Sequence, residues 1–392
     1  MDFSLHSGNL DKKRTDCLIV GAYEKQKLTP SAQQIDQASE GALVKLLKRE
    51  QFKGKVGDTL LLHQLPGCRA DRVLVVGLGQ AKDLSAKDYG KALASAIKVL
   101  TATPSQKVLC ALLEAEVARC DDRWKSRQIA LVFADGCYRF TELKSEPPAL
   151  PVLSQAEIHC QDKTQSAAIA QGTREGKAIA AGMKLAKDLA NLPGNICTPS
   201  YLAEQARKLA ERYPLLQATV LEQADMEKLG MGALLAVSRG SRQPPKLIVL
   251  EYLGGPPKDP PIALVGKGIT FDAGGISLKP AENMDEMKYD MCGGASVLGT
   301  MLAAAELGLP LNLVGAIPAC ENLPDGNAIK PGDIVKTMAG KTVEILNTDA
   351  EGRLILGDAL TYIQRFNPKL VIDLATLTGA CLVALGRHAT GL

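Results

Sequence analysis

The second half of the chain alternates short apolar runs with longer amphipathic runs, and this alternation constrains the fold more than any other feature. Short apolar runs between turn residues are typical of buried strands, whereas apolar residues three or four apart are typical of helices. The expected strands cover residues 246–252, 262–265, 311–318, 342–346 and 370–374, and the expected helices cover residues 291–307 and 357–365. This order predicts a mostly parallel central sheet flanked by helices, with ligands at the carboxyl ends of the strands.

The first 150 residues show a separate alternation of the same kind. The expected strands there cover residues 16–21, 59–63 and 72–77, and the expected helices cover residues 31–51, 86–100 and 123–132. Strands that alternate with helices indicate a sheet covered by those helices. The sequence therefore predicts an α/β protein with two domains, each built around its own sheet.

A proline-rich stretch at residues 144–151 separates the two alternating regions. Three prolines within five residues prevent both a helix and a central strand, so a domain boundary is expected here. The predicted arrangement is an N-terminal α/β domain over residues 1–150, a linker over residues 151–165 and a second domain over residues 166–392.

Two helices are expected at the start of the second domain. An alanine-rich amphipathic run over residues 164–191 ends at Pro193 and Gly194, which stop a helix. Thr198 and Pro199 then have the types of residue that begin one, an N-cap followed by a proline in the first helical position. A second helix is therefore expected from this point to Tyr213.

Composition excludes several classes of function. The net charge of +3 is too small to indicate a polyanion partner, and no apolar run approaches the ~18 residues of a membrane span. The N-terminus lacks the basic and apolar regions of a signal peptide. The ten cysteines form no C-x-x-C pair and mostly lie in apolar runs, as is typical of reduced, buried thiols. We expect a cytoplasmic protein with no membrane association.

Two carboxylates stand two residues apart in the octapeptide NTDAEGRL at residues 347–354. On a helix, side chains two residues apart point about 200° away from each other. On a turn, Asp349 and Glu351 can instead converge on one metal ion. For an isolated pair of this kind, a helix N-terminus with acidic residues on the helix dipole is the commoner explanation. A second acidic cluster upstream favours the metal site.

That second cluster follows the strand expected over residues 262–265. Lys267, Asp272 and Lys279 come after the strand, and Asp290 precedes the next helix. Each of these residues alone would be interpreted as surface charge. Together with the octapeptide, however, they place four carboxylates, two lysines and an arginine beside strand ends of one sheet. None of the four histidines is near, so the clusters resemble an oxygen-rich, two-metal hydrolytic site.

Several segments carry a resemblance to a known family. They are the octapeptide at residues 347–354, VGKGITFD at residues 265–272, DEMKYD at residues 285–290 and NLPGN at residues 191–195. On these segments the chain resembles the leucyl (cytosol) aminopeptidases, a hexameric family with two metal ions. The resemblance covers residues 188–392 well and the N-terminal domain loosely. It implies a metalloprotease of peptide catabolism that removes leucine and other apolar residues from the N-termini of peptides and from amino-acid amides.

The resemblance implies a role for each charged residue of the two clusters. Two divalent ions would be held by Lys267, Asp272, Asp290, Asp349 and Glu351. Of these ligands, Asp272 and Glu351 would bridge the two ions. Lys279 would polarise the substrate carbonyl, and Arg353 would hold a bicarbonate ion that acts as general base. Two cations can acidify a shared water, and a free peptide amine would bind one of them, which restricts cleavage to the N-terminus.

The resemblance also implies a pocket for the first substrate residue, lined by Met287, Thr376, Leu377 and Gly379. Apolar walls favour leucine-like side chains, but one methylene changes discrimination by only about 1–3 kcal/mol, so broad specificity is expected. Oxygen-rich ligation suits manganese or magnesium, and zinc tolerates it. The expected cofactors are two manganese or zinc ions per subunit, with magnesium or cobalt as alternatives, and bicarbonate.

The sequence departs from the family pattern at two places. Ala273 stands where many relatives carry serine beside the metal-binding aspartate, a change that removes no ligand. The chain ends at Leu392, whereas relatives continue through a region that completes the sheet, the pocket and the oligomer contacts. We therefore expect a catalytic domain that is incomplete at its C-terminus, and a homohexamer if that region is present.

Two other classes of function stay open. One is a DNA-binding accessory protein, which would need a basic face that the net charge of +3 does little to support. The other is a two-metal phosphoesterase, whose site would also be acidic but would usually contain histidine ligands. Steep salt dependence of DNA binding would favour the first, and hydrolysis of a phosphate ester in preference to leucine amide would favour the second.

Overall fold

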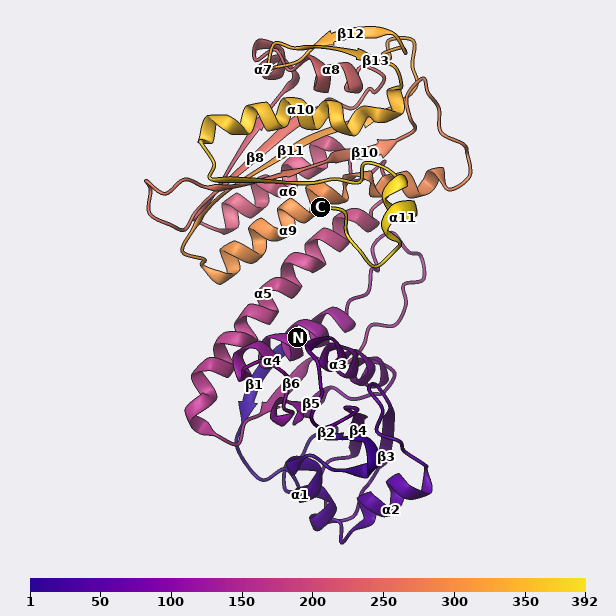
Figure 1. Cartoon of the computed structure of the whole chain (residues 1–392), viewed down its shortest axis with the longest axis vertical. Helices are drawn as coiled ribbons and strands as arrows, with labels where there is room; N and C mark the ends of the chain where they lie inside the picture. Colours follow the sequence, from indigo (N-terminus) through magenta and orange to yellow (C-terminus); the bar gives the residue numbers. More distant parts are fainter. The chain divides into compact units, whose positions relative to one another are not determined.

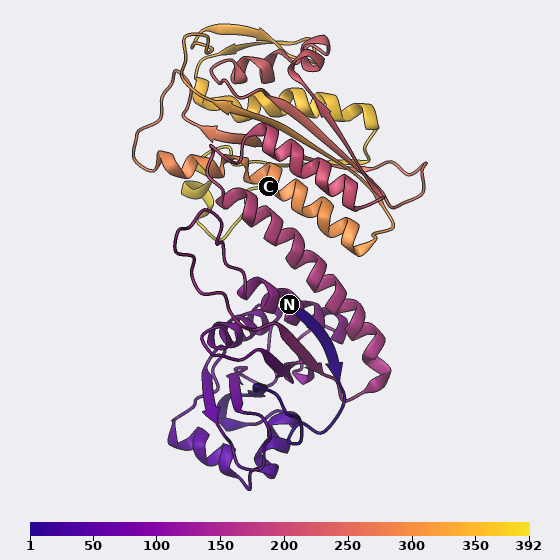
Figure 2. The same ribbon diagram turned by 180° about the vertical axis from the view of Figure 1, so that it is seen from behind.

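The computed structural model describes residues 1–392, except for the side chain of Lys163. The chain forms two compact units, residues 1–180 and residues 181–392, which Figures 1 and 2 show from opposite sides. Each unit contains a six-stranded sheet with helices packed on it. The α/β class with two separate sheets, predicted from the alternating patterns, is confirmed.

The sheet of the first unit is parallel except at one edge. Its strands have the order β1-β6-β5-β2-β4-β3, and only β3 runs antiparallel to its neighbour β4. They are β1 (Asp2–His6), β2 (Cys17–Ala22), β3 (Thr59–His63), β4 (Arg72–Gly77), β5 (Lys107–Cys110) and β6 (Gln155–His159). The strands expected at residues 16–21, 59–63 and 72–77 correspond to β2, β3 and β4.

The helices of the first unit agree with the sequence pattern except in one place. They are α1 (Pro30–Ala38), α2 (Ala42–Arg49), α3 (Ala86–Leu100), α4 (Asp122–Gly136) and the first part of α5 (Ser166–Asn191), with short 3₁₀ turns η1 (Glu24–Gln26), η2 (Leu112–Glu114) and η3 (Lys163–Gln165). The single helix expected over residues 31–51 is wrong. Glu40 and Gly41 have φ values of 52° and 78°, and this left-handed backbone ends α1 before α2 begins.

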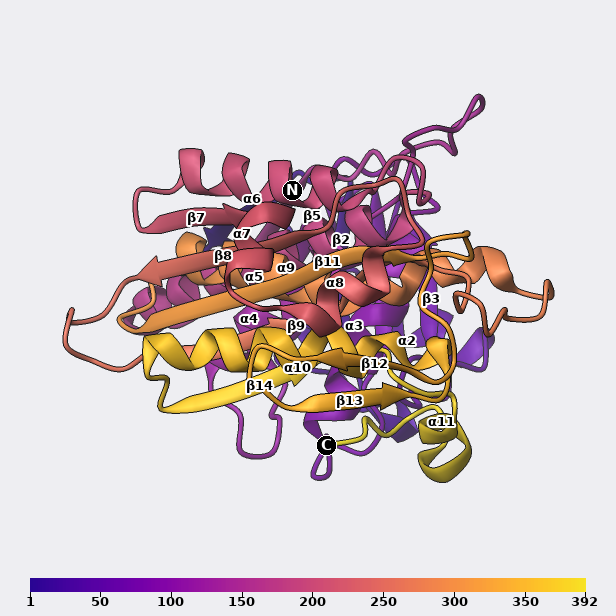
Figure 3. The same cartoon turned by 90° about the horizontal axis from the view of Figure 1, so that it is seen from above.

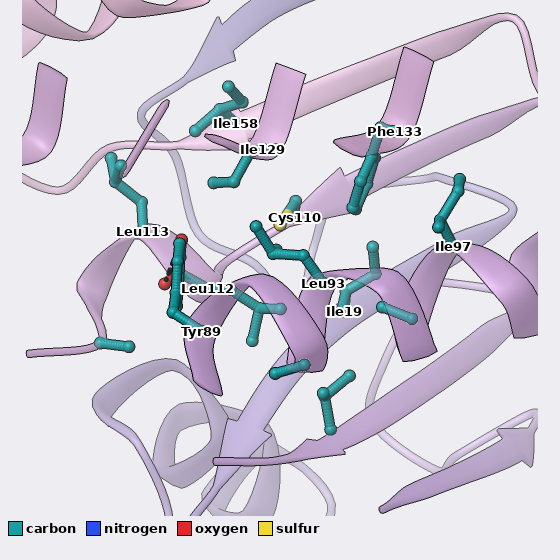
Figure 4. Packing of buried hydrophobic residues seen from close by; sticks show 14 of the residues in the cluster. Ile19, Tyr89, Leu93, Ile97, Cys110, Leu112, Leu113, Ile129, Phe133 and Ile158 are labelled. Atoms are coloured by element: carbon teal, nitrogen blue, oxygen red, sulfur yellow. Dashed lines mark hydrogen bonds between the residues drawn. The ribbon is translucent and has the colours of Figure 1, made fainter. Parts of the chain in front are cut away.

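The core between the first sheet and helices α3 and α4 shows why these segments are helical. Tyr89, Leu93 and Ile97 recur every four residues, so they share one face of α3, which packs against the sheet. Ile129 and Phe133 of α4 enter the same cluster (Figure 4). Full burial of a side chain of this size contributes about 1.5–3 kcal/mol to stability.

The segment expected to link the domains contains a strand of the first sheet. Strand β6 lies within residues 151–165 and pairs in parallel with both β1 and β5. The division between the two units falls inside α5, between Ala180 and Ala181. The domain boundaries given by the sequence remain a prediction.

The sheet of the second unit is mixed. Its strands are β7 (Leu216–Leu221), β8 (Lys246–Leu253), β9 (Ile262–Gly266), β10 (Gly268–Asp272), β11 (Asn312–Asn322) and β14 (Leu370–Leu374). The order is β14-β9-β11-β8-β7, and β10 also pairs with β11. Strands β14, β9, β10 and β11 are parallel, whereas β7 and β8 are antiparallel to their neighbours. The parallel part carries the residues singled out in the sequence.

Helices cover both faces of this sheet. The remaining elements are α6 (Pro199–Arg212), α7 (Gln223–Lys228), α8 (Gly232–Ser238), α9 (Cys292–Leu307), α10 (Glu351–Ile363), α11 (Ala380–Leu385), the hairpin β12 (Asp333–Lys336) and β13 (Thr342–Ile345), and the 3₁₀ segments η4 (Met284–Met291), η5 (Thr348–Ala350) and η6 (Gln364–Phe366). Helices α8 and α10 lie on the face that is near in Figure 3, and α6 and α9 lie on the other. The hydroxyl of Thr198 accepts from the Tyr201 amide, which confirms the predicted start of α6.

Two expectations about the whole chain can be compared with the structure. All ten cysteines are free thiols, as their scattered positions predicted. Within the part of the chain that the structure describes, no helix is both long enough and apolar enough to cross a bilayer.

Candidate metal centre

The centre is built where successive strands end beside one another. Strands β9 and β10 both pair with β11, one after the other, and Lys267 lies at their junction. The Lys267 amide donates to the Leu374 carbonyl at 2.9 Å, and its carbonyl accepts from the Gly294 amide at 2.8 Å. Asp272 is the last residue of β10. The carboxyl edge of the parallel strands therefore carries both residues, as expected for ligand sites in such sheets.

Lys267 lies at the middle of the buried charges. Its side-chain nitrogen is 2.8 Å from Oδ2 of Asp290 and 2.7 Å from Oε1 of Glu351. It also donates to the Thr376 carbonyl at 2.8 Å. The residue is only 2% exposed. Burial disfavours the charged amine, but the carboxylates of Asp290 and Glu351 outweigh that effect and raise the pKa of Lys267 above its ordinary value.

Lys279 pairs with the other two carboxylates. Its Nζ lies 2.9 Å from Oδ2 of Asp272 and 2.5 Å from Oδ1 of Asp349. Partial burial acts against the charge, yet these hydrogen-bonded carboxylates raise the pKa of Lys279 well above its usual range. Lys279 therefore stays protonated at neutral pH. The loop that carries it turns through Gly274, where φ is +87°, a conformation that favours glycine.

The octapeptide forms a turn that leads into a helix. Asp349 lies in the 3₁₀ segment η5, and Glu351 is the first residue of α10. The side chain of Asn347 accepts from the Asp349 amide at 2.9 Å and holds the turn. Because the backbone changes direction between them, Asp349 faces Lys279 while Glu351 faces Lys267.

The carboxylates leave oxygen atoms free for a cation. Asp272, Asp290 and Glu351 are all buried, and one oxygen of each lies within 4.8 Å of the others. Oε2 of Glu351 and Oδ2 of Asp290 have no hydrogen bond among the described residues, although Oδ2 is close to the Lys267 nitrogen. Burial, offset in part by Lys267, raises the pKa of Asp290 to about 7. Buried oxygen donors without partners fit a hard divalent ion.

The remaining predicted residues lie around this cluster in different ways. Thr376 donates from Oγ1 to Oδ1 of Asp290 at 2.6 Å. The Leu377 side chain lies beside Gly352, 2.8 Å from where a Cβ would stand. Met287 is half-buried in η4, and Gly379 is exposed before α11.

Arg353 is the one charged residue of the predicted site without an ion pair in the part of the chain that the structure describes. It is exposed in the first turn of α10. Among the described residues it makes no hydrogen bond or ion pair, so its guanidinium is available to an anion. This surrounding differs from that of the two lysines, both of which are held by carboxylates.

Sequence reasoning overlooked one buried polar residue of the centre. Asn322 ends β11, is 2% exposed, and its amide Nδ2 donates to Oδ1 of Asp272 at 2.9 Å and to the Thr348 carbonyl at 3.0 Å. The strand expected over residues 311–318 stops short of Asn322, and a single amide has no characteristic spacing, so the sequence pattern did not identify it.

Comparison with protein families accounts for both units. The profile of the cytosol aminopeptidase family, catalytic domain, matches residues 184–392, and that of the family's N-terminal domain matches residues 19–147. A protein named "Probable cytosol aminopeptidase" from Nitrosococcus oceani is 54% identical over all of this chain and 78% of its own length. Its namesake from Methylobacillus flagellatus is 53% identical over all of this chain and 79% of its own length.

Solved structures give the same result. The bottromycin maturation enzyme BotP in complex with Mn is 34% identical, with a TM-score of 0.79 over 95% of this chain and 74% of that one. A mutant of tomato leucine aminopeptidase is 32% identical, with a TM-score of 0.84 over 98% of this chain and 75% of that one.

Proposed function

Because the chain belongs to the cytosol aminopeptidase family and is therefore a metal-dependent aminopeptidase, we propose that the buried acidic cluster is its catalytic centre. The proposed metal ligands are Lys267, Asp272, Asp290, Asp349 and Glu351. The observation that carries this proposal is the group of three buried carboxylates, Asp272, Asp290 and Glu351, whose oxygens lie within 4.8 Å of one another. Two of them, Asp290 and Glu351, have an oxygen without a hydrogen bond among the described residues.

The centre is proposed to hold two divalent ions. Carboxylate oxygens suit manganese or magnesium, and zinc or cobalt would also be accepted. Manganese has direct support from a relative, since BotP has been solved in complex with Mn. When bound, the ions would supply an acidified water and stabilise negative charge on the substrate.

The two lysines are proposed to have different roles. Lys267 contacts Asp290 and Glu351 deep in the cluster, so it can approach an ion only as a neutral amine that has lost its proton. Lys279 is less buried and held by Asp272 and Asp349. Its persistent positive charge would orient the substrate carbonyl and stabilise the developing oxyanion.

Arg353 and the segment around Thr376 are proposed to complete the site. The exposed guanidinium would hold bicarbonate, which would act as general base. Thr376 and Leu377 lie against Asp290 and Gly352 respectively, so their segment borders the metal cluster. With Met287 and Gly379, they would form an apolar pocket for leucine-like side chains.

The wider biological setting is also a proposal. The named relatives are cytosol aminopeptidases, which supports a cytoplasmic enzyme acting on peptides. A homohexamer is proposed as the assembly of a chain that carries the C-terminal region of its relatives. Sedimentation analysis of that chain after purification would test this: a single species of six chains is expected, and a stable monomer at micromolar concentration would contradict it.

Three substrates test the proposed reaction in one experiment. Leucine amide should be hydrolysed in the presence of Mn²⁺, because its free amine and its carbonyl can both reach the centre. N-acetyl-leucine amide differs only by a blocked amine and should not be cleaved. Phenyl phosphate provides the control for a two-metal phosphoesterase. Equal rates on the free and acetylated amides would contradict the exopeptidase mechanism, and a faster rate on the phosphate ester would contradict the peptidase assignment.

A further inference from the structure

We propose that Asn322 is a positioning residue that fixes the orientation of Asp272 and ties together the two loops that form the metal centre, a role that rests on the proposed function of that centre. Asn322 would touch neither substrate nor ion. It would act through Asp272, which is proposed as a ligand, and through the backbone of Thr348.

Strand pairing places Asn322 directly beside Asp272. In the parallel register of β10 and β11, Asp272 is the partner of Asn322, and each ends its strand. Nδ2 of Asn322 donates to Oδ1 of Asp272 at 2.9 Å and to the Thr348 carbonyl at 3.0 Å. The two hydrogens of the amide are thus directed at two different segments, and the backbone carbonyl of Asn322 accepts from the Ala273 amide at 2.9 Å.

These contacts determine which oxygen of Asp272 faces the centre. Oδ1 accepts from the Gly274 amide and from Asn322, both at 2.9 Å. Oδ2 instead faces the ammonium of Lys279 at 2.9 Å. The carboxylate plane is therefore set by two donors on one oxygen, and the other oxygen is presented to the centre. Groups that hold a ligand in this way govern metal affinity as well as ligand orientation.

Thr348 forms the second half of the same bridge. Its hydroxyl donates to the Gly274 carbonyl at 2.7 Å and accepts from the Ser277 amide at 2.8 Å. Its own amide donates to the Ser277 hydroxyl at 3.2 Å. The loop that carries Lys279 is thereby fastened to the turn that carries Asp349. Asn322 holds this turn from the sheet side through the Thr348 carbonyl.

An amide suits this position better than a carboxylate. Both of the groups that Nδ2 contacts, Oδ1 of Asp272 and the Thr348 carbonyl, are acceptors. A carboxylate at residue 322 would place an acceptor against two acceptors and add a negative charge in a buried site. Asn322→Asp therefore keeps the shape of the side chain but replaces two attractive hydrogen bonds with repulsion between acceptors. Asn322→Ala removes the two hydrogen bonds without adding repulsion.

The chain offers a matched control on the same strand. Asn312 begins β11, is also buried, and donates from Nδ2 to the carbonyls of Pro256 and Asp259 at 2.8 and 3.0 Å. Asn312→Ala removes these two hydrogen bonds and a third, which the Gly255 amide donates to Oδ1 at 3.0 Å, all far along the strand from the centre. It therefore measures the cost of losing such bonds without disturbing Asp272.

The test measures Mn²⁺ binding to metal-stripped protein by calorimetry and thermal unfolding with and without Mn²⁺. Asn322→Ala and Asn322→Asp should bind Mn²⁺ about 10- to 100-fold more weakly than wild type, and the rise in Tm caused by Mn²⁺ should shrink. Excess Mn²⁺ should restore part of the lost turnover while KM for leucine amide stays unchanged. Asn312→Ala should lower the Tm of the stripped protein and leave Mn²⁺ affinity unchanged.

A milder pair of variants covers the case in which Asn322→Ala does not fold. Thr348→Ser keeps the hydroxyl and should retain Mn²⁺ affinity, whereas Thr348→Val should lose it. The test requires that wild type binds Mn²⁺ and cleaves leucine amide. The inference is then overturned if the Asn322 variants, or Thr348→Val, bind Mn²⁺ as tightly as wild type. If wild type itself neither binds Mn²⁺ nor cleaves leucine amide, the proposed function fails instead.

Discussion

Lys267 and Glu351 form a buried pair, with Nζ of the lysine 2.7 Å from Oε1 of the glutamate and both side chains almost inaccessible to solvent. The two residues come from different elements, the β9–β10 junction and the start of α10. A buried charge needs a partner, and here the ammonium compensates carboxylates that would otherwise repel one another. The same arrangement allows a bound cation to replace that positive charge.

The two lysines should therefore respond differently to substitution. Lys267→Ala should weaken binding of at least one metal ion and lower turnover by at least the roughly 100-fold that loss of supporting groups can cost. Lys267→Arg should be no better, because a guanidinium does not deprotonate and cannot donate a lone pair. Lys279→Ala should keep both ions and lose turnover by about 10²- to 10³-fold. Metal content per chain after gel filtration checks this, and the reverse pattern would show that the roles are exchanged.

Arg353 should affect turnover but not metal binding. Its side chain is exposed and lies on α10 two residues after Glu351. Arg353→Ala should lower kcat by about 10²-fold or more, as expected for loss of a general base, and added bicarbonate should stimulate the variant less than wild type. Metal analysis of the same samples provides the control. Loss of metal from Arg353→Ala would mean that this residue supports the ligands directly.

The residues of the centre were accessible to sequence reasoning for a physical reason. A metal site requires several carboxylates near strand ends, and such residues are conspicuous at positions 272, 290, 349 and 351. Asn322 lacks that signal, since a single amide at a strand end has no characteristic spacing. Its role follows only from the register that sets it beside Asp272.

The stability of the second unit should depend on a buried carboxylate outside the centre. Asp358 of α10 is fully buried and accepts from the amides of Ala233, Leu234 and Met338 at 2.8–2.9 Å. Asp358→Ala would leave these donors unsatisfied and should lower the free energy of unfolding by about 2–5 kcal/mol. Chemical denaturation measures this. The exposed Glu211 supplies the control, and a comparable loss in Glu211→Ala would contradict the explanation.

A histidine pair in the first unit predicts a pH dependence of stability. The rings of His6 and His159 lie 6.0 Å apart at paired positions of β1 and β6. Burial and the neighbouring His6 lower the pKa of His159, and burial and Lys13 lower the pKa of His6. The unfolded histidines take up protons near pH 6.5, before the folded ones do. The contribution of the pair to the free energy of unfolding should therefore be fully present above that pH and should be lost as the solution becomes more acidic.

The matching experiment compares unfolding free energies between pH 8 and about pH 5, the range in which histidine titrates. His159→Gln should flatten the dependence, because one titrating group and its neighbour's repulsion are removed. His63→Gln, at an exposed histidine of β3, should keep the wild-type slope. Identical slopes for wild type and His159→Gln would exclude the pair as the cause.

The differences between the predicted and observed fold have identifiable causes. Residues 31–51 have a continuous amphipathic pattern, but left-handed backbone at Glu40 and Gly41 divides them into α1 and α2. The prolines near residue 147 correctly mark irregular chain, but strand β6 follows them. The sequence pattern did not reveal β6, because its partners β1 and β5 are distant in sequence. Periodicity records which residues are buried, not which strands will pair.

The central claim is that hydrolysis depends on two divalent ions held by the acidic cluster. Its most direct test strips the protein with a chelator and titrates Mn²⁺ back while bound metal and leucine amide hydrolysis are measured on the same samples. The account predicts no activity in the stripped protein and full activity once two ions are bound per chain. Undiminished hydrolysis by the stripped protein, or full activity in a Glu351→Ala variant that binds no metal, would contradict it.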